Sequence, residues 1–280
     1  MSQANRMRQL RCREFTLPLD RTLLMGVLNV TPDSFSDGGR FLDPGEAVRH
    51  ARRMVEEGAD LIDAGAESSR PGSDPVPAEE EWRRLRPVLE GLLREVRVPV
   101  SVDTCKPEVA GRALALGAHM LNDIGGLRDP AMIETVASHG AAVVIMHMKG
   151  EPKTMQQAAE YEDVVGEVKA FLEQQAARAA AAGIDGIVID PGLGFGKTAQ
   201  HSLEILRRLP ELVELGYPVL MGPSRKSFIG HVTGAPVEER LEGTLAAVTV
   251  SVLGGARIVR VHDVKQCRRA VQVAEAIRGA

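Results

Sequence analysis

Short apolar runs alternate along the chain with stretches long enough for one helix each. The runs cover residues 23–30, 61–66, 98–103, 119–124, 141–148, 186–190, 218–221 and 256–261. The intervening stretches predict helices over 44–57, 78–96, 107–116, 130–138, 156–182, 201–215 and 241–254, and a last helix covers 264–277. Alternating strands and helices predict a parallel sheet. Eight repeats predict an α/β fold, a single (β/α)8 TIM barrel spanning residues 1–280.

The first 22 residues precede the first apolar run and form an N-terminal extension. Within it, residues 14–19 could form a strand that closes the floor of the barrel. The chain has 280 residues, close to the roughly 250 residues of one such barrel.

Residues able to do chemistry gather where the runs end, and in a TIM barrel these ends form the active-site mouth. Asp63, Asp103, Asn122 and Asp190 lie near the ends of four runs. Carboxylates accept hydrogen bonds, while an amide both donates and accepts. Such a set fits a ligand with a row of N–H donors beside an acceptor, for example an aminopyrimidinone ring. A separate set of cations suits phosphate oxygens; its members are Arg70, Arg225, Lys226, Arg260 and His262.

Composition narrows the functional class. The net charge is −4, with 34 basic and 38 acidic residues, which argues against nucleic acid and anionic membranes as partners. Three cysteines without a CxxC spacing argue against a disulfide scaffold or a zinc site and favour the cytoplasm. The most apolar long stretch, 244–256, is too short to span a bilayer.

The glycine-rich run 192–198 reads GLGFGKT and could suggest a phosphate loop. A Walker A motif requires a glycine where this chain has Pro191. A dinucleotide fingerprint fits only loosely and lacks its supporting acid. The glycines therefore predict close approach of the backbone to a flat ligand. For His147, flanked by two methionines, a packing role at the core or rim is favoured over a metal-binding role.

Residues 25–39 read MGVLNVTPDSFSDGG, and this run resembles the opening motif of the dihydropteroate synthases, the sulfonamide targets of the folate pathway. The resemblance extends over about residues 23–265. Further motifs match in order at 67–72, 101–104, 122–124, 190–197, 224–227 and 260–263. Ala66 and Ser69 stand where the family usually has Gly and Thr.

The resemblance implies a transferase that joins 4-aminobenzoate to 6-hydroxymethyl-7,8-dihydropterin diphosphate, with Mg²⁺, and releases diphosphate. The implied pterin-binding residues are Asp103, Asn122, Ile124, Met146, Asp190, Lys226 and Arg260. Diphosphate would be bound by Asn29, Ser69, Arg70 and His262, with Asn29 on the metal and Asp33 nearby. The aminobenzoate pocket would comprise Ser69, Arg70, Pro71, Phe195, Lys226 and Ser227. Lys226, Arg260, Asp103 and Arg70 would act in catalysis.

Two alternatives stay open at this point. A corrinoid-type methyltetrahydrofolate methyltransferase would share the barrel and the pterin-binding acids, but it would need neither the segment 224–227 nor a diphosphate pocket. A non-catalytic pterin-binding paralogue should have lost polar residues after the first two runs, and this chain retains them. The resemblance also implies a homodimer, formed through helices late in the chain.

Overall fold

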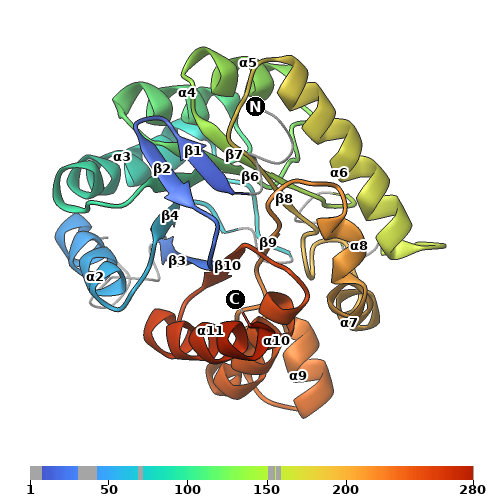
Figure 1. The fold of residues 1–280 in the computed structure, drawn as a ribbon. Helices are drawn as coiled ribbons and strands as arrows, with labels where there is room; N and C mark the ends of the chain where they lie inside the picture. Colours follow the sequence, from blue (N-terminus) through green and yellow to red (C-terminus); the bar gives the residue numbers. More distant parts are fainter. Residues whose placement is uncertain (1–7, 31–42, 69–71, 151–154, 156–158, 280) are drawn as a thin grey trace.

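Eight parallel strands of the described part of the chain form one sheet that curves into a barrel (Figure 1). The computed structural model describes residues 8–30, 43–68, 72–150, 155 and 159–279. Around the barrel the strands are β8 (Ile187–Asp190), β7 (Ala142–Met146), β6 (Met120–Asp123), β5 (Val100–Asp103), β4 (Leu61–Gly65), β3 (Leu23–Asn29), β10 (Ile258–Val261) and β9 (Leu220–Met221). β8 and β9 meet at a parallel bridge between Ile189 and Val219. The predicted TIM barrel is confirmed.

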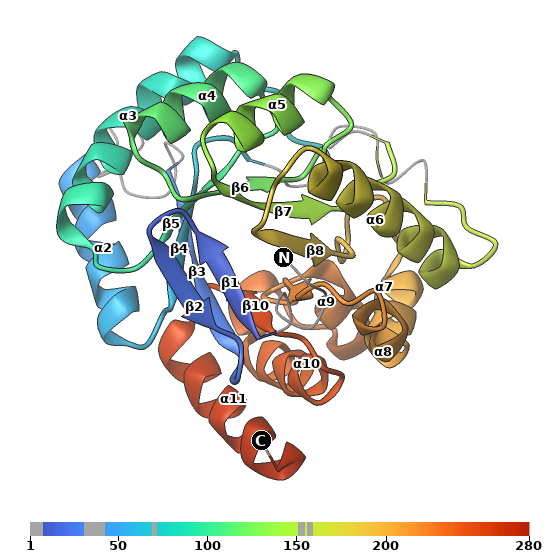
Figure 2. The same cartoon turned by 45° about the horizontal axis from the view of Figure 1, so that its top comes forward.

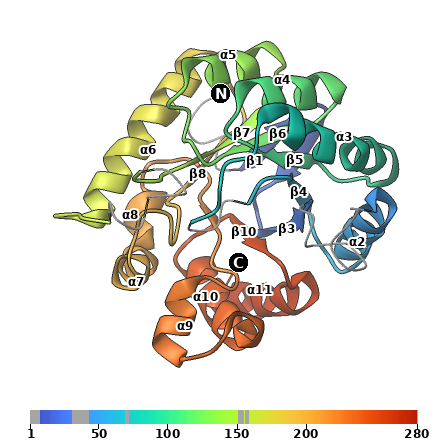
Figure 3. The same cartoon turned by 180° about the vertical axis from the view of Figure 1, so that it is seen from behind.

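Helices surround the sheet, as Figures 1 and 3 show from opposite sides. They are α2 (Pro44–Glu56), α3 (Ala78–Glu95), α4 (Pro107–Leu116), α5 (Pro130–Ser138), α6 (Val164–Ala181), α7 (Ala199–Arg207), α8 (Leu209–Val213), α9 (Ser227–Thr233), the 3₁₀ turn η2 (Val237–Glu239), α10 (Leu241–Leu253) and α11 (Val264–Arg278). Of the helices in the described residues, none is both long and apolar enough to cross a membrane.

Local capping explains why several helices begin where the sequence predicts. Asp43 and Asp129 accept hydrogen bonds from the backbone N–H groups of Gly45 and Ala131, at the starts of α2 and α5. A proline follows each aspartate, where its fixed φ and missing N–H cost nothing.

Two helix predictions are wrong in their bounds. The helix expected over 156–182 begins at Val164, because the side chain of Asp163 caps it there. The helix expected over 201–215 is two helices separated at Arg208. Pro210 lies in the first turn of α8, and a proline inside a continuous helix would remove one backbone hydrogen bond and clash with the preceding turn. The short helix α9 begins at Ser227, where the sequence allows a helix to open, whereas the turn η2 is not predicted.

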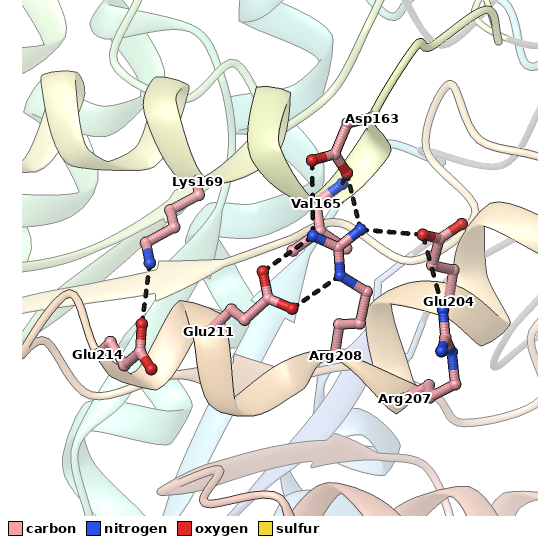
Figure 4. Close-up of polar contacts among 8 residues, drawn as sticks. All are labelled: Asp163, Val165, Lys169, Glu204, Arg207, Arg208, Glu211 and Glu214. Atoms are coloured by element: carbon pink, nitrogen blue, oxygen red, sulfur yellow. Dashed lines mark hydrogen bonds and ion pairs between the residues drawn. The ribbon is translucent and has the colours of Figure 1, made fainter.

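Arg208 joins the three helices around this break (Figure 4). Its guanidinium donates to Asp163 at 2.8 Å, to Glu204 at 3.0 Å and to Glu211 at 2.7 and 2.9 Å. These three carboxylates raise the pKa of Arg208 further above its ordinary value. The fork geometry of arginine suits several carboxylates at once, so this contact fixes the start of α6 against α7 and α8.

A two-stranded hairpin covers the amino-terminal end of the barrel and lies in front of it in Figure 1. It pairs β1 (Gln9–Cys12) with β2 (Phe15–Pro18) in antiparallel register. Its buried side chains Leu10 and Cys12 pack in one cluster with Leu23 and Met25 of β3. The expected strand at the barrel floor is therefore present, as part of a hairpin separate from the barrel sheet.

Candidate active site

Polar side chains gather at the carboxyl ends of the barrel strands. Asp103 is paired in register with Asn122, and Met146 with Asp190. Arg260 lies on β10, which pairs with both β3 and β9. It therefore approaches the same end of the barrel from a strand on the opposite side. These positions are separated by up to 157 residues in sequence, and the parallel sheet brings them to one end of the barrel.

Arg260 is held by two carboxylates. Its Nε donates to Asp63 at 2.7 Å and its Nη2 donates to Asp103 at 2.9 Å. Asp63 is fully buried, so an unpaired carboxylate there would be costly. The ion pairs therefore fix the guanidinium across the mouth of the barrel.

The sequence groups Asp63 with the ligand-binding acids, but in the structure it holds two neighbouring side chains instead. Its Oδ2 accepts from both Arg260 and Asn122, at 2.7 and 2.9 Å. The sequence signal was a lone acid inside the apolar run 61–66. That signal is compatible with any buried ion pair, and only the structure shows which two side chains it joins.

Asn122 has a defined orientation because of this contact. A carboxylate only accepts hydrogen bonds, so the amide must turn its Nδ2 toward Asp63. Its Oδ1 is then buried and has no partner among the described residues. A buried acceptor without a partner costs free energy, and an N–H donor from a ligand would satisfy it.

Asp190 is presented by a tight turn after β8. Its Oδ1 accepts from the backbone N–H of Gly192 at 2.7 Å. Gly192 has φ +67°, and a Cβ there would lie 2.1 Å from the carbonyl oxygen of His147. Only glycine fits this position, so the turn that aims Asp190 depends on it.

Burial and neighbouring charges shift the pKa values of the ionisable groups at the mouth of the barrel. Burial raises the pKa of Asp103 to about 7, although Arg260 opposes the shift. Burial also raises the pKa of Asp190. Burial and the nearby Arg260 lower the pKa of Lys226 to about 8. Perturbed groups gathered in one place are typical of an active site.

An apolar wall adjoins these polar groups. Ile124 and Met146 pack with Met148, Met155 and Phe195 in one cluster. The Nζ of Lys226 lies 4.1 Å from the centre of the Phe195 ring, a cation–π contact. Polar groups on one side and an apolar wall on the other suit a flat heterocycle.

A second group of side chains lies beside Arg260. Ser224 Oγ and His262 Nδ1 are 2.9 Å apart, and Arg225 forms two hydrogen bonds with Asp263, at 3.1 and 2.7 Å. Burial and the neighbouring Arg260 lower the pKa of His262 to about 4. The imidazole is therefore neutral near pH 7 and can donate a hydrogen bond to an anion.

The remaining predicted residues are placed as follows. Asn29 is the last residue of β3, and Ser227 is the exposed first residue of α9. Asp33, Ser69, Arg70 and Pro71 lie outside the described residues. Within the described ranges, no three His, Cys, Asp or Glu side chains gather closely enough to hold a metal ion.

His147 and the glycine-rich run also lie near this end of the barrel. His147 is buried and has ring contacts with Phe171 and Tyr161. The sequence favoured a packing role for it, and this environment agrees. Lys197, from the run 192–198, contacts it.

Comparisons with known proteins show what the chain resembles. Residues 25–262 match the family model described as pterin binding enzyme. The dihydropteroate synthase of Escherichia coli is 46% identical over 267 residues, which cover 95% of each chain. A crystal structure of dihydropteroate synthase from Thermus thermophilus in complex with 4-aminobenzoate is 53% identical, with a TM-score of 0.88 over 96% of this chain and 100% of that one. A second Thermus structure, in complex with 6HMPPP, is 51% identical with a TM-score of 0.85, over the same shares of the two chains.

Proposed function

The chain belongs to the pterin-binding enzyme family, and we infer from its site and from its similarity to dihydropteroate synthases that it is a dihydropteroate synthase. It joins 6-hydroxymethyl-7,8-dihydropterin diphosphate to 4-aminobenzoate, which produces 7,8-dihydropteroate and diphosphate. This is a transferase reaction of folate biosynthesis.

The observation that carries this assignment is the arrangement of hydrogen-bonding groups around Asn122. Its free Oδ1 can accept from a pterin N–H, while Asp103 and Asp190 can accept from further donors on the same edge. Lys226 can donate to the pterin carbonyl. Arg260 is fixed by Asp63 and Asp103, and its guanidinium can stack on the face of the pterin ring. The apolar side chains Ile124 and Met146 border the ring.

The reaction breaks a C–O bond and forms a C–N bond. Diphosphate departs with the electron pair of the C–O bond and leaves a methylene cation that the electron-rich pterin ring delocalises. The amine of 4-aminobenzoate then attacks this carbon and loses a proton. No covalent enzyme nucleophile is needed.

The side chains contribute by position and charge. Asp103 and Asp190 orient the pterin so that its methylene group faces the apolar wall at Phe195. His262, Ser69 and Arg70 bind the diphosphate, and the positive charge of Arg70 stabilises the departing anion. The Nζ of Lys226 lies over the ring of Phe195. In the proposal it borders the aminobenzoate pocket together with Ser227, Ser69, Arg70 and Pro71.

Mg²⁺ is part of the proposal. Asn29 offers one neutral oxygen at the end of β3, and the described residues hold no ready cluster of metal ligands. This donor set fits a cation that keeps several waters and takes its other ligands from phosphate oxygens. When bound, Mg²⁺ would neutralise charge on the departing diphosphate.

We also propose a homodimer and a cytoplasmic location. The exposed faces of α10 and α11 carry Val250, Leu253, Val273 and Ile277, which are 46, 44, 60 and 68% exposed. Exposed apolar side chains on two adjacent helices favour association of two copies (Figure 2). Cys12, Cys105 and Cys267 are free thiols, as proteins of a reducing compartment usually have.

The test is diphosphate release, followed together with formation of 7,8-dihydropteroate, in the presence of Mg²⁺. Both products should appear in equal amounts only when both substrates are present. Diphosphate without dihydropteroate would indicate simple hydrolysis. Pterin binding with neither product would support the non-catalytic alternative, and methyl transfer from methyltetrahydrofolate to a corrinoid would support the methyltransferase.

A further inference from the structure

The mechanism above leaves one buried cation unused. Lys197 lies between β8 and α7 and is 2% exposed. Lysine is rarely buried to this extent unless it is paired. Among the described residues, no carboxylate forms an ion pair with it, and burial lowers its pKa to about 7. An ammonium held there without a carboxylate has to be stabilised by other acceptors.

Those acceptors come from two separate loops. The Nζ of Lys197 lies 2.9 Å from His147 Nδ1, 3.1 Å from His147 O and 3.0 Å from Phe195 O. In its protonated form Lys197 has three N–H donors, and these three acceptors match them. These contacts join the end of β7 to the loop that follows β8.

The His147 side of this contact is firmly held. Its backbone N–H donates to Asp190 O at 2.9 Å, and its ring meets the edge of Phe171 at 5.1 Å between ring centres. Burial and the nearby Lys197 lower the pKa of His147 to about 2. The ring is therefore neutral, with Nδ1 free to accept from Lys197 and its proton on Nε2.

The other side of the contact determines where Phe195 lies. The backbone of Phe195 is held at two points, its N–H by Gly192 O at 3.1 Å and its carbonyl by Lys197. The ring packs in the cluster with Ile124 and Met146 and lies under Lys226. Tyr161 donates to Gly196 O at 2.9 Å and Asp190 accepts from Gly192 N–H at 2.7 Å, but the side chain that bonds to Phe195 itself is that of Lys197.

We propose that Lys197 is a positioning residue, which uses His147 as its anchor to hold Phe195 at the boundary between the pterin and aminobenzoate sites. It thereby sets the affinity for aminobenzoate without contacting either substrate. This inference rests on the proposed function, because it concerns the pocket that Phe195 borders.

The main test is the Lys197→Met variant, which keeps the aliphatic stem and removes all three donors. Two backbone carbonyls then lose a charged donor, and the loop carrying Phe195 becomes less restrained. Because hydrogen bonds from a charged donor are lost, we expect the KM for aminobenzoate to rise about 10-fold or more. The KM for the pterin diphosphate should change less than about 3-fold, because Asp190 keeps its own contact with Gly192.

Two further variants make the result specific. Lys197→Gln keeps an amide donor and should recover part of the aminobenzoate affinity. Lys169→Met removes a lysine on α6 that pairs with Glu214 at 3.1 Å (Figure 4) and should leave both KM values unchanged. If Lys197→Met fails to fold, Lys197→Gln serves as the test. Its KM for aminobenzoate should then rise by a smaller factor, and its KM for the pterin diphosphate should not change.

A double-mutant cycle separates positioning from general stabilisation. If Lys197 acts through Phe195, then Phe195→Ala with Lys197→Met should bind aminobenzoate no worse than Phe195→Ala alone. Multiplied effects, or equal rises in both KM values, would overturn the proposal. Absence of turnover in the unaltered enzyme would refute the proposed function itself. Normal turnover in both the unaltered enzyme and Lys197→Met would refute only the role of Lys197.

Discussion

At the scale of single residues, the site is defined by carboxylates in different surroundings. Asp63 is fully buried and holds two neighbouring side chains, so its charge is used within the protein. Asp190 has one oxygen bound to a backbone N–H and is close to the apolar wall, so it can serve a ligand. The same residue type thus has an internal role in one place and a binding role in the other.

Asp190 supplies the first prediction. Replacement by Ala removes the carboxylate that accepts two hydrogen bonds from pterin N–H groups, each contributing roughly 1.5–3 kcal/mol. Calorimetry should show pterin binding weakened by about 100-fold or more. As a matched control, Asp129→Ala removes an exposed cap of α5 and should leave the affinity unchanged. Pterin affinity within a few-fold of the unaltered enzyme, in a folded Asp190→Ala protein, would contradict the assignment.

Asp103 supplies a prediction about pH. Burial raises its pKa to about 7, so it is a carboxylate above that pH and a neutral acid below it. A neutral acid offers the pterin N–H groups fewer acceptors. The dissociation constant for pterin should therefore rise by about 10-fold from pH 8 to pH 6, as expected when a group of this pKa must be ionised. The Asp103→Asn variant should bind pterin more weakly and lose most of this pH dependence. If the dissociation constant of the variant changed with pH as before, another group would be responsible.

At the scale of elements, Lys106 anchors the connection between β4 and α3. Its Nζ forms ion pairs with Glu67, just after β4, and with Glu81 of α3 at 2.6 Å. Glu67 also accepts from the backbone N–H of Val76 at 2.8 Å. One lysine at the start of α4 therefore holds both ends of a connection that includes residues 69–71.

Removal of this lysine should be costly because Glu81 is fully buried. The Lys106→Met variant leaves the buried carboxylate of Glu81 without its ion pair. We expect the free energy of unfolding to fall by about 3 kcal/mol or more. The double variant Lys106→Met with Glu81→Gln removes the buried charge and should recover a large part of the loss. Urea unfolding measures both. A double variant as unstable as Lys106→Met would show that the buried charge is not the cause.

At the scale of the whole molecule, the adjacent helices α10 and α11 both expose large apolar side chains to solvent. α10 and α11 are adjacent in Figures 1 and 2 and carry four of the large exposed apolar side chains. We expect a particle of about twice the 30.1 kDa chain mass by light scattering at micromolar concentration. Val273→Lys with Ile277→Lys should yield a monomer that keeps its barrel. A 30 kDa particle from the unaltered chain would refute the dimer.

Much of the fold follows from the sequence because the barrel strands are buried on both faces. All eight lie within short apolar runs of the sequence, and the starts of α4 and α5 follow from their prolines. The start of α6 and the break at Arg208 were harder to predict. The helical pattern continues through both places. The start of α6 depends on a local cap, in which Asp163 accepts from the N–H of Val165, whereas Arg208 is fixed by a tertiary contact with Asp163.

The sequence by itself determined the order of elements, the family and most residues at the mouth of the barrel. These depend on local patterns and on motifs that are contiguous in the chain. Only the tertiary structure showed that Asp63 orients Asn122 and Arg260, and that Lys197 joins His147 to Phe195. Such contacts link residues up to 197 positions apart. Their partners are chosen by strand register and burial, which emerge only when the barrel closes.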